Sequence, residues 1–270
     1  MAEEVAAAAV AAVAATPQAQ AQVTFVTALF VPPGGSYRSV DKYQEHFQQL
    51  AATGVPIRLF LDPILHEYGE WLEETWSNVR VVDWLVPDKS FLAPLVEKRQ
   101  PVVLPTKRNE KKDTIDYMCV QLMKLPLCAK AAATVAATTA ATPFVAWIDF
   151  GIFHMFKDVS KATAMLRDIT FGSVTMSLPR DRILSPGCWD AGTYPIWASI
   201  CWRHCGSFLL GARELFADAA ATQAELVRLN LPGLTWEVNY WNELERLFHV
   251  YKANHNDTIL RGLLETWPAT

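Results

Sequence analysis

The stretch PFVAWIDFG, residues 143–151, decides how the chain is expected to fold. A proline opens it, and a run of apolar, β-favouring residues then ends on one acid, Asp149. Such a run predicts a strand covered on both faces, as in a parallel sheet. In open α/β sheets, ligands bind beyond the carboxyl ends of the strands. Asp149 is therefore expected at the edge of the sheet where a ligand would lie.

The residues before this stretch alternate between strand and helix patterns. Apolar runs at 23–31, 57–62 and 79–86 predict strands, and the apolar spacing of 39–52 and 64–76 predicts amphipathic helices. Strands that alternate with helices imply right-handed crossovers and a mostly parallel sheet. The predicted fold class is α/β, with a mostly parallel central sheet flanked by helices.

Composition excludes several classes of protein. With 270 residues, of which 51% are hydrophobic and 19% charged, the chain can bury a large core and is not a disordered protein. A net charge of -4 offers no basic surface for nucleic acid or an anionic membrane, so a small partner is expected. Five cysteines without a regular framework suit a reducing compartment and predict no disulfides.

Residues 1–22 are rich in alanine and are expected to form a flexible arm. The charges that lead this segment are acidic, whereas a signal peptide begins with positive charge. No window elsewhere offers the roughly 18 apolar residues of a membrane span. We therefore expect a soluble, cytoplasmic protein. The stretch CWRHC, with Cys201, His204 and Cys205, has partial metal-site spacing, but no second Cys/His pair follows it, which favours a core role.

Two interpretations of Asp149 are open on the residue pattern. A carboxylate at the end of a buried strand needs a cation, a hydrogen-bond donor or water nearby, and Gly151 would let a ligand or backbone approach closely. The alternative is an acid that caps the loop after a core strand.

The order of VTFVTALF, then Arg38 and Tyr43, then IRLFLD and WIDFGI resembles the HtrL/YibB-type group of proposed glycosyltransferases, which has relatives in large viruses. It resembles more loosely the GT-A nucleotide-sugar-dependent transferases. The resemblance spans about residues 23–260, with support from HCGSFLLGARELF and TWEVNYW. It implies a single GT-A-like (Rossmann-like) domain over 23–270, with a nucleotide-binding half at 23–151 and an acceptor-binding half at 152–270.

The resemblance implies transfer of a sugar from a nucleotide-diphosphate donor, a UDP-sugar, to a glycan or glycoprotein acceptor. It places a divalent metal, Mn²⁺ or Mg²⁺, at Asp149, where the cation would stabilise the leaving diphosphate as a Lewis acid. Gly151 stands where the second acid of the Asp-x-Asp motif would be, so either Asp149 alone supplies the protein carboxylate, with other ligands from elsewhere, or metal dependence is weak or absent. His255, in ANHNDT, is the implied late metal ligand, and an Asn/Asp-rich turn is its alternative.

The expected donor contacts lie near the same sheet edge. The resemblance places Thr27 and Ala28 against the nucleotide through backbone groups, and Arg38 could reach a phosphate through its guanidinium. Asp62 closes the second strand and could accept a hydrogen bond from ribose or base. Lys107 belongs to a cationic run before a helix, which would suit an anionic donor. For Arg38 and Lys107 the alternative is a solvated charge.

The second half is expected to carry the acceptor. Glu237, near the start of a helix, is the candidate general base, with Asp190 as the reserve. The alternative for Glu237 is stabilisation of the helix dipole, or sugar positioning if the reaction retains configuration. Trp189 and Trp236 are the expected sugar-stacking residues. A strand is predicted at 172–180.

Two other functions stay open. One is a metal-assisted phosphohydrolase that uses Asp149 or Asp62, although both stretches lack a second acid. The other is a non-catalytic sugar- or nucleotide-binding relative of the transferases, which Gly151 favours.

Overall fold

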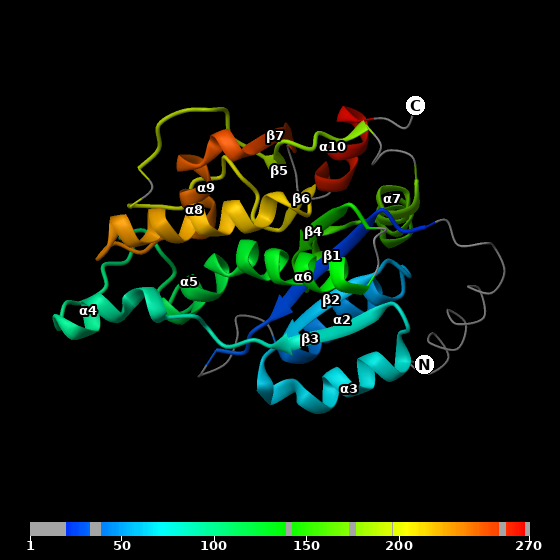
Figure 1. Ribbon diagram of the computed structural model, residues 1–270, viewed down its shortest axis with the longest axis horizontal. Helices are drawn as coiled ribbons and strands as arrows, with labels where there is room; N and C mark the ends of the chain where they lie inside the picture. Colours follow the sequence, from blue (N-terminus) through cyan, green and yellow to red (C-terminus); the bar gives the residue numbers. More distant parts are fainter. Residues whose placement is uncertain are drawn as a thin grey trace.

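A single mixed sheet takes strands from both halves of the chain (Figure 1). The computed structural model describes residues 20–32, 39–138, 142–172, 177–195, 197–253 and 258–267. Within them the sheet has seven strands in the order β3-β2-β1-β4-β6-β5-β7. The strands are β1 (Val23–Leu29), β2 (Ile57–Leu61), β3 (Val79–Trp84), β4 (Phe144–Ile148), β5 (Ile183–Gly187), β6 (Phe208–Ala212) and β7 (Phe248–Lys252).

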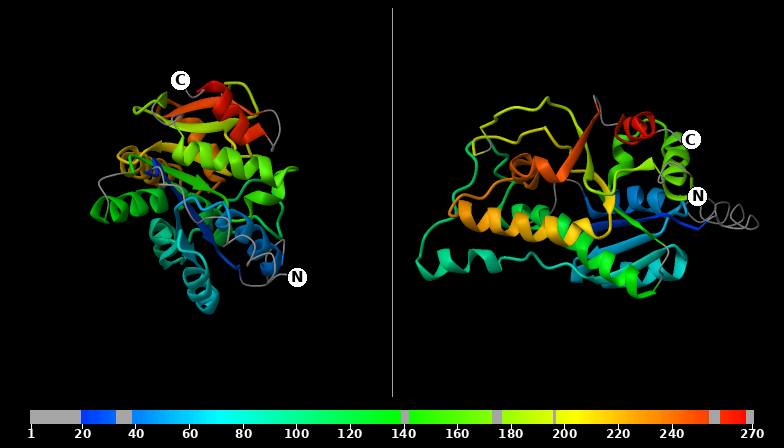
Figure 2. Two further views of the ribbon diagram at one scale, coloured as in Figure 1. Left: turned by 90° about the vertical axis from the view of Figure 1, so that its right-hand side faces the viewer. Right: turned by 45° about the horizontal axis from the view of Figure 1, so that its top comes forward.

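Helices cover both faces of this sheet (Figures 1 and 2). The α-helices are α2 (Val40–Ala51), α3 (His66–Thr75), α4 (Ala93–Glu97), α5 (Ile115–Leu122), α6 (Lys124–Thr138), α7 (Val159–Phe171), α8 (Leu215–Asn230), α9 (Glu237–Glu243) and α10 (Ile259–Thr266). Short 3-10 turns are η1 (Pro63–Leu65), η2 (Ser90–Leu92), η3 (Ile152–Met155) and η5 (Glu245–Leu247). The predicted α/β class, a mostly parallel sheet flanked by helices, is confirmed.

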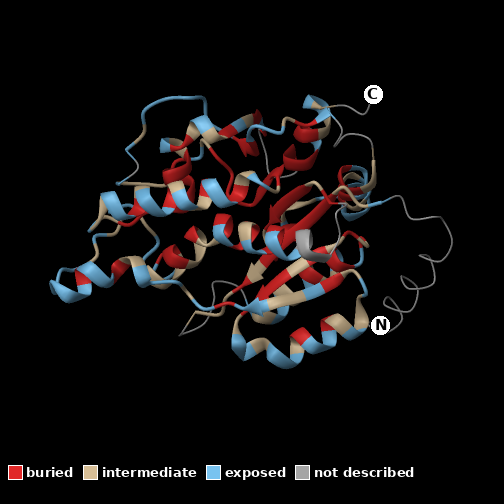
Figure 3. Cartoon of the chain, in the orientation of Figure 1, coloured by how far each residue is buried: buried red, intermediate tan, exposed pale blue. Residues whose placement is uncertain are grey.

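The two faces of each strand enter two different cores. On β1, Phe25 packs with residues of α2, α7 and α10, whereas Val26 packs with residues of α5, α6 and α8. Burial on both faces explains why the central strands are almost continuously apolar, and Figure 3 shows them buried beneath helices whose outer sides are exposed. Within the described residues, no helix is long and apolar enough to cross a membrane.

One strand runs against its neighbours and shapes the edge of the sheet. β1, β2, β3 and β4 are parallel, but β6 is antiparallel to both β4 and β5. The start of β6 therefore lies beside the end of β4, with Phe208 opposite Ile148. The next residue, Asp149, donates its backbone N–H to the carbonyl of Ser207 at 2.9 Å. Segments from both halves of the chain meet where β4 ends.

The predicted strand at 172–180 is wrong for its described residues. Residues 177–180 form a 3-10 position and bends, and β5 begins at Ile183. The expected arm lies mostly outside the described residues, which begin at 20.

Candidate functional site

Asp149 lies at the carboxyl end of β4, as its place in the sequence predicted. Its Oδ1 accepts a hydrogen bond from Trp147 Nε1 at 2.9 Å and lies 3.4 Å from Lys124 Nζ. The side chain is still 40% exposed. The carboxylate is thus oriented by protein groups through one oxygen, while part of it faces solvent.

Lys124 opens α6 and joins segments that lie far apart in the sequence. Its Nζ donates to the carbonyl of Gly206 at 2.7 Å and to Glu237 Oε1 at 2.8 Å, in addition to the contact with Asp149. Only 4% of its side chain is exposed. Burial by itself would lower the pKa of Lys124, but the carboxylates of Asp149 and Glu237 outweigh burial and raise it. Lys124 is therefore held as a buried cation.

Glu237, the first residue of α9, lies on the other side of this cation. Its side chain is 5% exposed, and its partner is the ammonium of Lys124. A Cβ on Gly206 would lie 2.4 Å from Glu237 Oε1 and 3.1 Å from Lys124 Nζ, so a side chain at 206 would disturb the ion pair. Asp149, Lys124 and Glu237 form one network, which we call the Lys124 triad.

Tyr117, on α5, belongs to the same neighbourhood. Burial raises the pKa of its hydroxyl well above the ordinary value, and the negative charges of Glu237, Asp149 and Asp113 raise it further. Asp113 is itself buried and accepts the backbone N–H of Asn109 at 2.9 Å. The phenol is thus held neutral and can donate a hydrogen bond.

Packing against Tyr43 explains why residue 151 is a glycine. A Cβ at this position would lie 2.8 Å from Cδ1 of Tyr43, which is closer than side-chain atoms normally approach. The carbonyl of Gly151 also contacts Nδ1 of His154. The ring of Tyr43 on α2 thus takes the space that a second acid of an Asp-x-Asp motif would need.

The expected donor contacts near the first two strands are placed unequally. Thr27 is fully buried within β1, so a ligand does not reach its backbone in this conformation, whereas Ala28 is partly exposed. Both carboxylate oxygens of Asp62 are used by backbone groups: Oδ1 accepts from Ile64 N and Oδ2 from Val31 N, each at 3.1 Å. Asp62 therefore caps η1 and holds the loop that follows β1 at Val31, which is a structural role.

Two other expected site residues, Lys107 and Asp190, are not joined to the Lys124 triad. Lys107 is exposed, with its backbone N–H donated to the carbonyl of Ala198 at 2.8 Å. Asp190 is exposed, and its carbonyl accepts the hydroxyl of Tyr194. Among the described residues, no hydrogen bond or ion pair connects either side chain to Asp149. Arg38 and His255 lie outside the described residues.

Two tryptophans were expected to stack on sugars, and the prediction for Trp236 is wrong. It is buried in the core that includes α6 and α8, so neither face is open to a sugar. Trp189 is exposed, and its ring lies 5.1 Å from that of Tyr194.

The CWRHC residues have separate partners in the interior. His204 Nδ1 lies 3.2 Å from Ser185 Oγ, and Cys205 Sγ lies 3.0 Å from Ser207 Oγ. Burial, followed by the charge of Arg203, lowers the pKa of His204 to about 3. Within the described residues, no three His, Cys, Asp or Glu side chains form a group that could hold a metal ion.

A divalent cation fits at Asp149 only if a bound phosphate supplies most of its ligands. Mg²⁺ in phosphate-transfer sites is commonly bound through one or two carboxylates together with substrate phosphates. Asp149 offers one partly exposed carboxylate whose Oδ1 is already engaged, so phosphate oxygens would supply most of the coordination. The ammonium of Lys124 repels a cation at this distance, but it also attracts the same phosphates.

Lys124 is the site residue that sequence reasoning missed. It is the first residue of KLPLCAK, which resembles an ordinary helix start, and lysine is rarely buried. The available signal was Pro126: proline is tolerated in the first turn of a helix, so a new helix beginning at Lys124 was foreseeable. Nothing in the local pattern indicated its partners, which lie 25 and 113 positions away.

Comparisons with known proteins find only distant likeness. No protein-family model matches the chain, and no curated protein matches it. Among solved structures, a 4-diphosphocytidyl-2C-methyl-D-erythritol synthase from Anaerococcus prevotii DSM 20548 has a TM-score of 0.41 and 8% identity, covering 90% of this chain and 95% of that one. Mouse xyloside xylosyltransferase 1, in its apo form, has a TM-score of 0.40 and 11% identity, covering 84% of each chain. Likeness at this level carries no argument about ligands or activity.

Proposed function

We propose that the chain is a nucleotide-sugar-dependent glycosyltransferase that moves a sugar from a nucleotide-diphosphate donor, a UDP-sugar, to a carbohydrate acceptor. The observation that carries the proposal is the partly exposed carboxylate of Asp149, held at the carboxyl end of a parallel strand beside a buried cation. Open α/β sheets bind ligands at this edge. The sequence resemblance to the HtrL/YibB-type group, which rests in part on WIDFGI around Asp149, also supports the proposal.

In the proposed reaction the bond from the anomeric carbon to the donor phosphate breaks, and the acceptor hydroxyl oxygen bonds to that carbon and loses its proton. Asp149, with the donor phosphates, would hold a divalent cation that supplies Lewis-acid stabilisation of the leaving diphosphate. Trp147 orients Asp149 Oδ1, and Lys124 places positive charge beside it. Preorganised charge of this kind lowers the barrier because it needs no rearrangement during the reaction.

The role that we propose for Glu237 is to position Lys124. A general base must come within hydrogen-bond reach of the acceptor hydroxyl. Glu237 is covered and paired with the ammonium, which suits positioning better than proton abstraction. Asp190, the reserve candidate, has an exposed carboxylate, and we propose it as the base that takes the proton of the acceptor hydroxyl.

Binding of the donor can be tested by thermal unfolding with UDP, with and without Mn²⁺. A ligand at 100 times its Kd stabilises the native state by about 2.7 kcal/mol, which corresponds to a rise in Tm of roughly 5–10 °C for a chain of this size. We expect UDP together with Mn²⁺ to raise Tm more than UDP alone does. Asp149→Asn should remove the added effect of the metal, since it keeps an acceptor for Trp147 but loses the charge. Asp181→Ala, at an exposed aspartate before β5, is the matched control.

A non-catalytic nucleotide- or sugar-binding protein is the second candidate. The observation in its favour is that Glu237 is buried and paired. A Tm shift with UDP but no hydrolysis or transfer from any nucleotide sugar in a panel would support this second function. The absence of a shift with every nucleoside diphosphate would remove both.

A further inference from the structure

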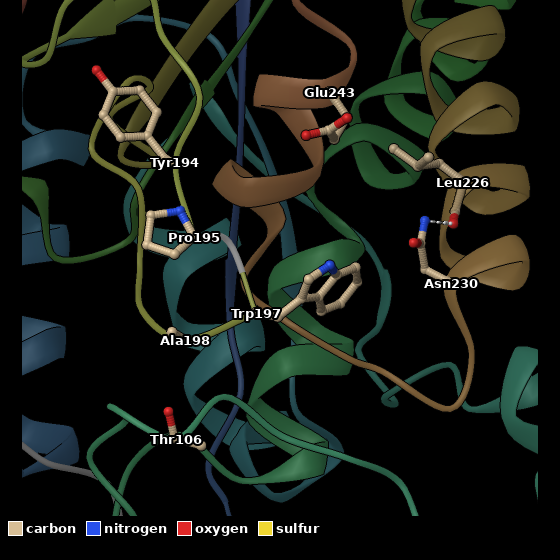
Figure 4. A pocket seen from close by; sticks show the side chains of 8 residues that line it. All are labelled: Thr106, Tyr194, Pro195, Trp197, Ala198, Leu226, Asn230 and Glu243. Atoms are coloured by element: carbon tan, nitrogen blue, oxygen red, sulfur yellow. Dashed lines mark hydrogen bonds between the residues drawn. The ribbon is translucent and has the colours of Figure 1, made fainter.

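A pocket of about 670 Å³ lies between the C-terminal end of α8, the end of α9 and the loop that carries Pro195 and Trp197 (Figure 4). This volume falls within the roughly 300–1,000 Å³ of small-molecule sites. The lining side chains used below are Thr106, Tyr194, Trp197, Leu226, Asn230 and Glu243. The pocket combines one large aromatic surface with several hydrogen-bonding groups.

Trp197 is partly exposed and contacts neighbouring residues with the rest of its ring. It is 41% exposed. Its ring makes an edge contact with Tyr240, with centroids 6.1 Å apart and planes at 80°. A Cβ on Gly233 would lie 3.1 Å from Cζ3 of Trp197, so the glycine allows the indole to sit close against the backbone. An oriented indole with open surface can pack on the apolar face of a sugar ring.

The polar groups of the pocket are mostly acceptors. Asn230 Nδ2 donates to the carbonyl of Leu226 at 2.8 Å, which leaves Oδ1 to accept (Figure 4). Glu243 is exposed and contributes a carboxylate, and Thr106 contributes a hydroxyl. No lysine or arginine is among the described lining residues. Such a set suits the hydroxyl donors of a neutral sugar and disfavours an anionic ligand.

The pocket wall is preformed by a buried amide. Asn239, on α9, accepts the N–H of Cys201 at 2.6 Å through Oδ1 and donates to the carbonyl of Ser199 at 3.0 Å and to Thr235 Oγ1 at 2.8 Å. These bonds fix the loop that follows Trp197. A ligand would therefore bind without first ordering this wall, which favours affinity.

The same helix connects the pocket to the Lys124 triad. α9 begins with Glu237, in the triad, and ends with Glu243, in the pocket. At about 1.5 Å of rise per residue, the two positions are separated by roughly 9 Å along the helix axis.

We propose that this pocket binds one ring of a neutral saccharide, which stacks on Trp197 and donates hydroxyls to Asn230 and Glu243. Its assignment as a subsite for the acceptor rests on the proposed glycosyltransferase function. Binding of the saccharide does not rest on it, because no nucleotide takes part.

The test is titration of the full chain by calorimetry or ligand-observed NMR, without nucleotide, using cellobiose, lactose and maltose as probes. At least one of them should bind. Trp197→Ala should weaken its binding tenfold or more, and Trp197→Phe should weaken it less. Trp202→Ala is the matched control, because Trp202 is 42% exposed and does not line the pocket.

Charge selectivity provides a second readout. A methyl glucuronide should bind more weakly than the matching methyl glucoside, and Glu243→Gln should reduce this difference because it removes the repelling carboxylate. Three outcomes would overturn the proposal: no saccharide binds, Trp202→Ala weakens binding as much as Trp197→Ala, or UDP competes with the saccharide at this pocket. If UDP and the other nucleoside diphosphates give no shift in Tm, the glycosyltransferase proposal fails, whereas the saccharide titration still decides whether this pocket binds a sugar.

Discussion

Replacement of Lys124 by methionine should destabilise the protein strongly. Lys124 Nζ lies 2.8 Å from Glu237 and 3.4 Å from Asp149, which at an effective dielectric constant of 20 corresponds to about 6 and 5 kcal/mol of gross attraction. Desolvation offsets much of this, and the Asp149 share is screened because that side chain is 40% exposed. Removing one partner of a buried pair typically costs about 3–5 kcal/mol.

We therefore expect Lys124→Met to lower the free energy of unfolding by about 3 kcal/mol, measured by urea denaturation at pH 7, and to lower Tm by roughly 6–12 °C. Lys130→Met is the matched control on the same helix. Lys130 pairs with Asp83 at the surface, where both side chains are about half exposed, so its loss should cost under about 1 kcal/mol.

The cause can be separated from the size of the effect. In the variant, Glu237 would be a buried carboxylate without its cation, and an unpaired buried charge is costly. Glu237→Gln in the Lys124→Met background should recover at least half of the loss. A loss below about 1 kcal/mol, or one that Glu237→Gln leaves unchanged, would refute this account.

Two further predictions concern His204 and Gly151. Burial lowers the pKa of His204 to about 3. Below about pH 6.5 the native state therefore binds fewer protons than the unfolded state, so the free energy of unfolding should decrease as the pH is lowered. The loss attributable to His204 at pH 5 is about 2 kcal/mol, and urea denaturation of His204→Phe should show a correspondingly flatter pH dependence; an unchanged slope would contradict the assignment. Gly151→Ala should cost about 1–3 kcal/mol because its Cβ would meet the ring of Tyr43 at 2.8 Å. The cost should fall in a Tyr43→Leu background, and an equal cost in both backgrounds would exclude this contact as its cause.

Much of the central sheet was predictable because its strands are buried on both faces. The runs that became β1, β2 and β4 are nearly continuous in apolar, β-favouring residues, and no alternative element accommodates such a pattern as well. The expected strand at 172–180 is wrong for its described residues, where the chain is mostly bent and not extended. Alternating apolar residues over so short a span do not specify a strand without neighbours to pair with.

For the site, the sequence by itself determined that Asp149 would follow a buried strand and lie at the carboxyl edge of the sheet. The apolar run predicts burial of the strand, and the alternation of strands with helices predicts its parallel direction. Tertiary structure decided the rest. The antiparallel insertion of β6 beside β4 brings Gly206 next to Asp149, and the docking of α6 and α9 places Lys124 between two acids. A buried charge is tolerated only where partners from other segments meet it, and that meeting is a property of the packed fold rather than of any single stretch of residues.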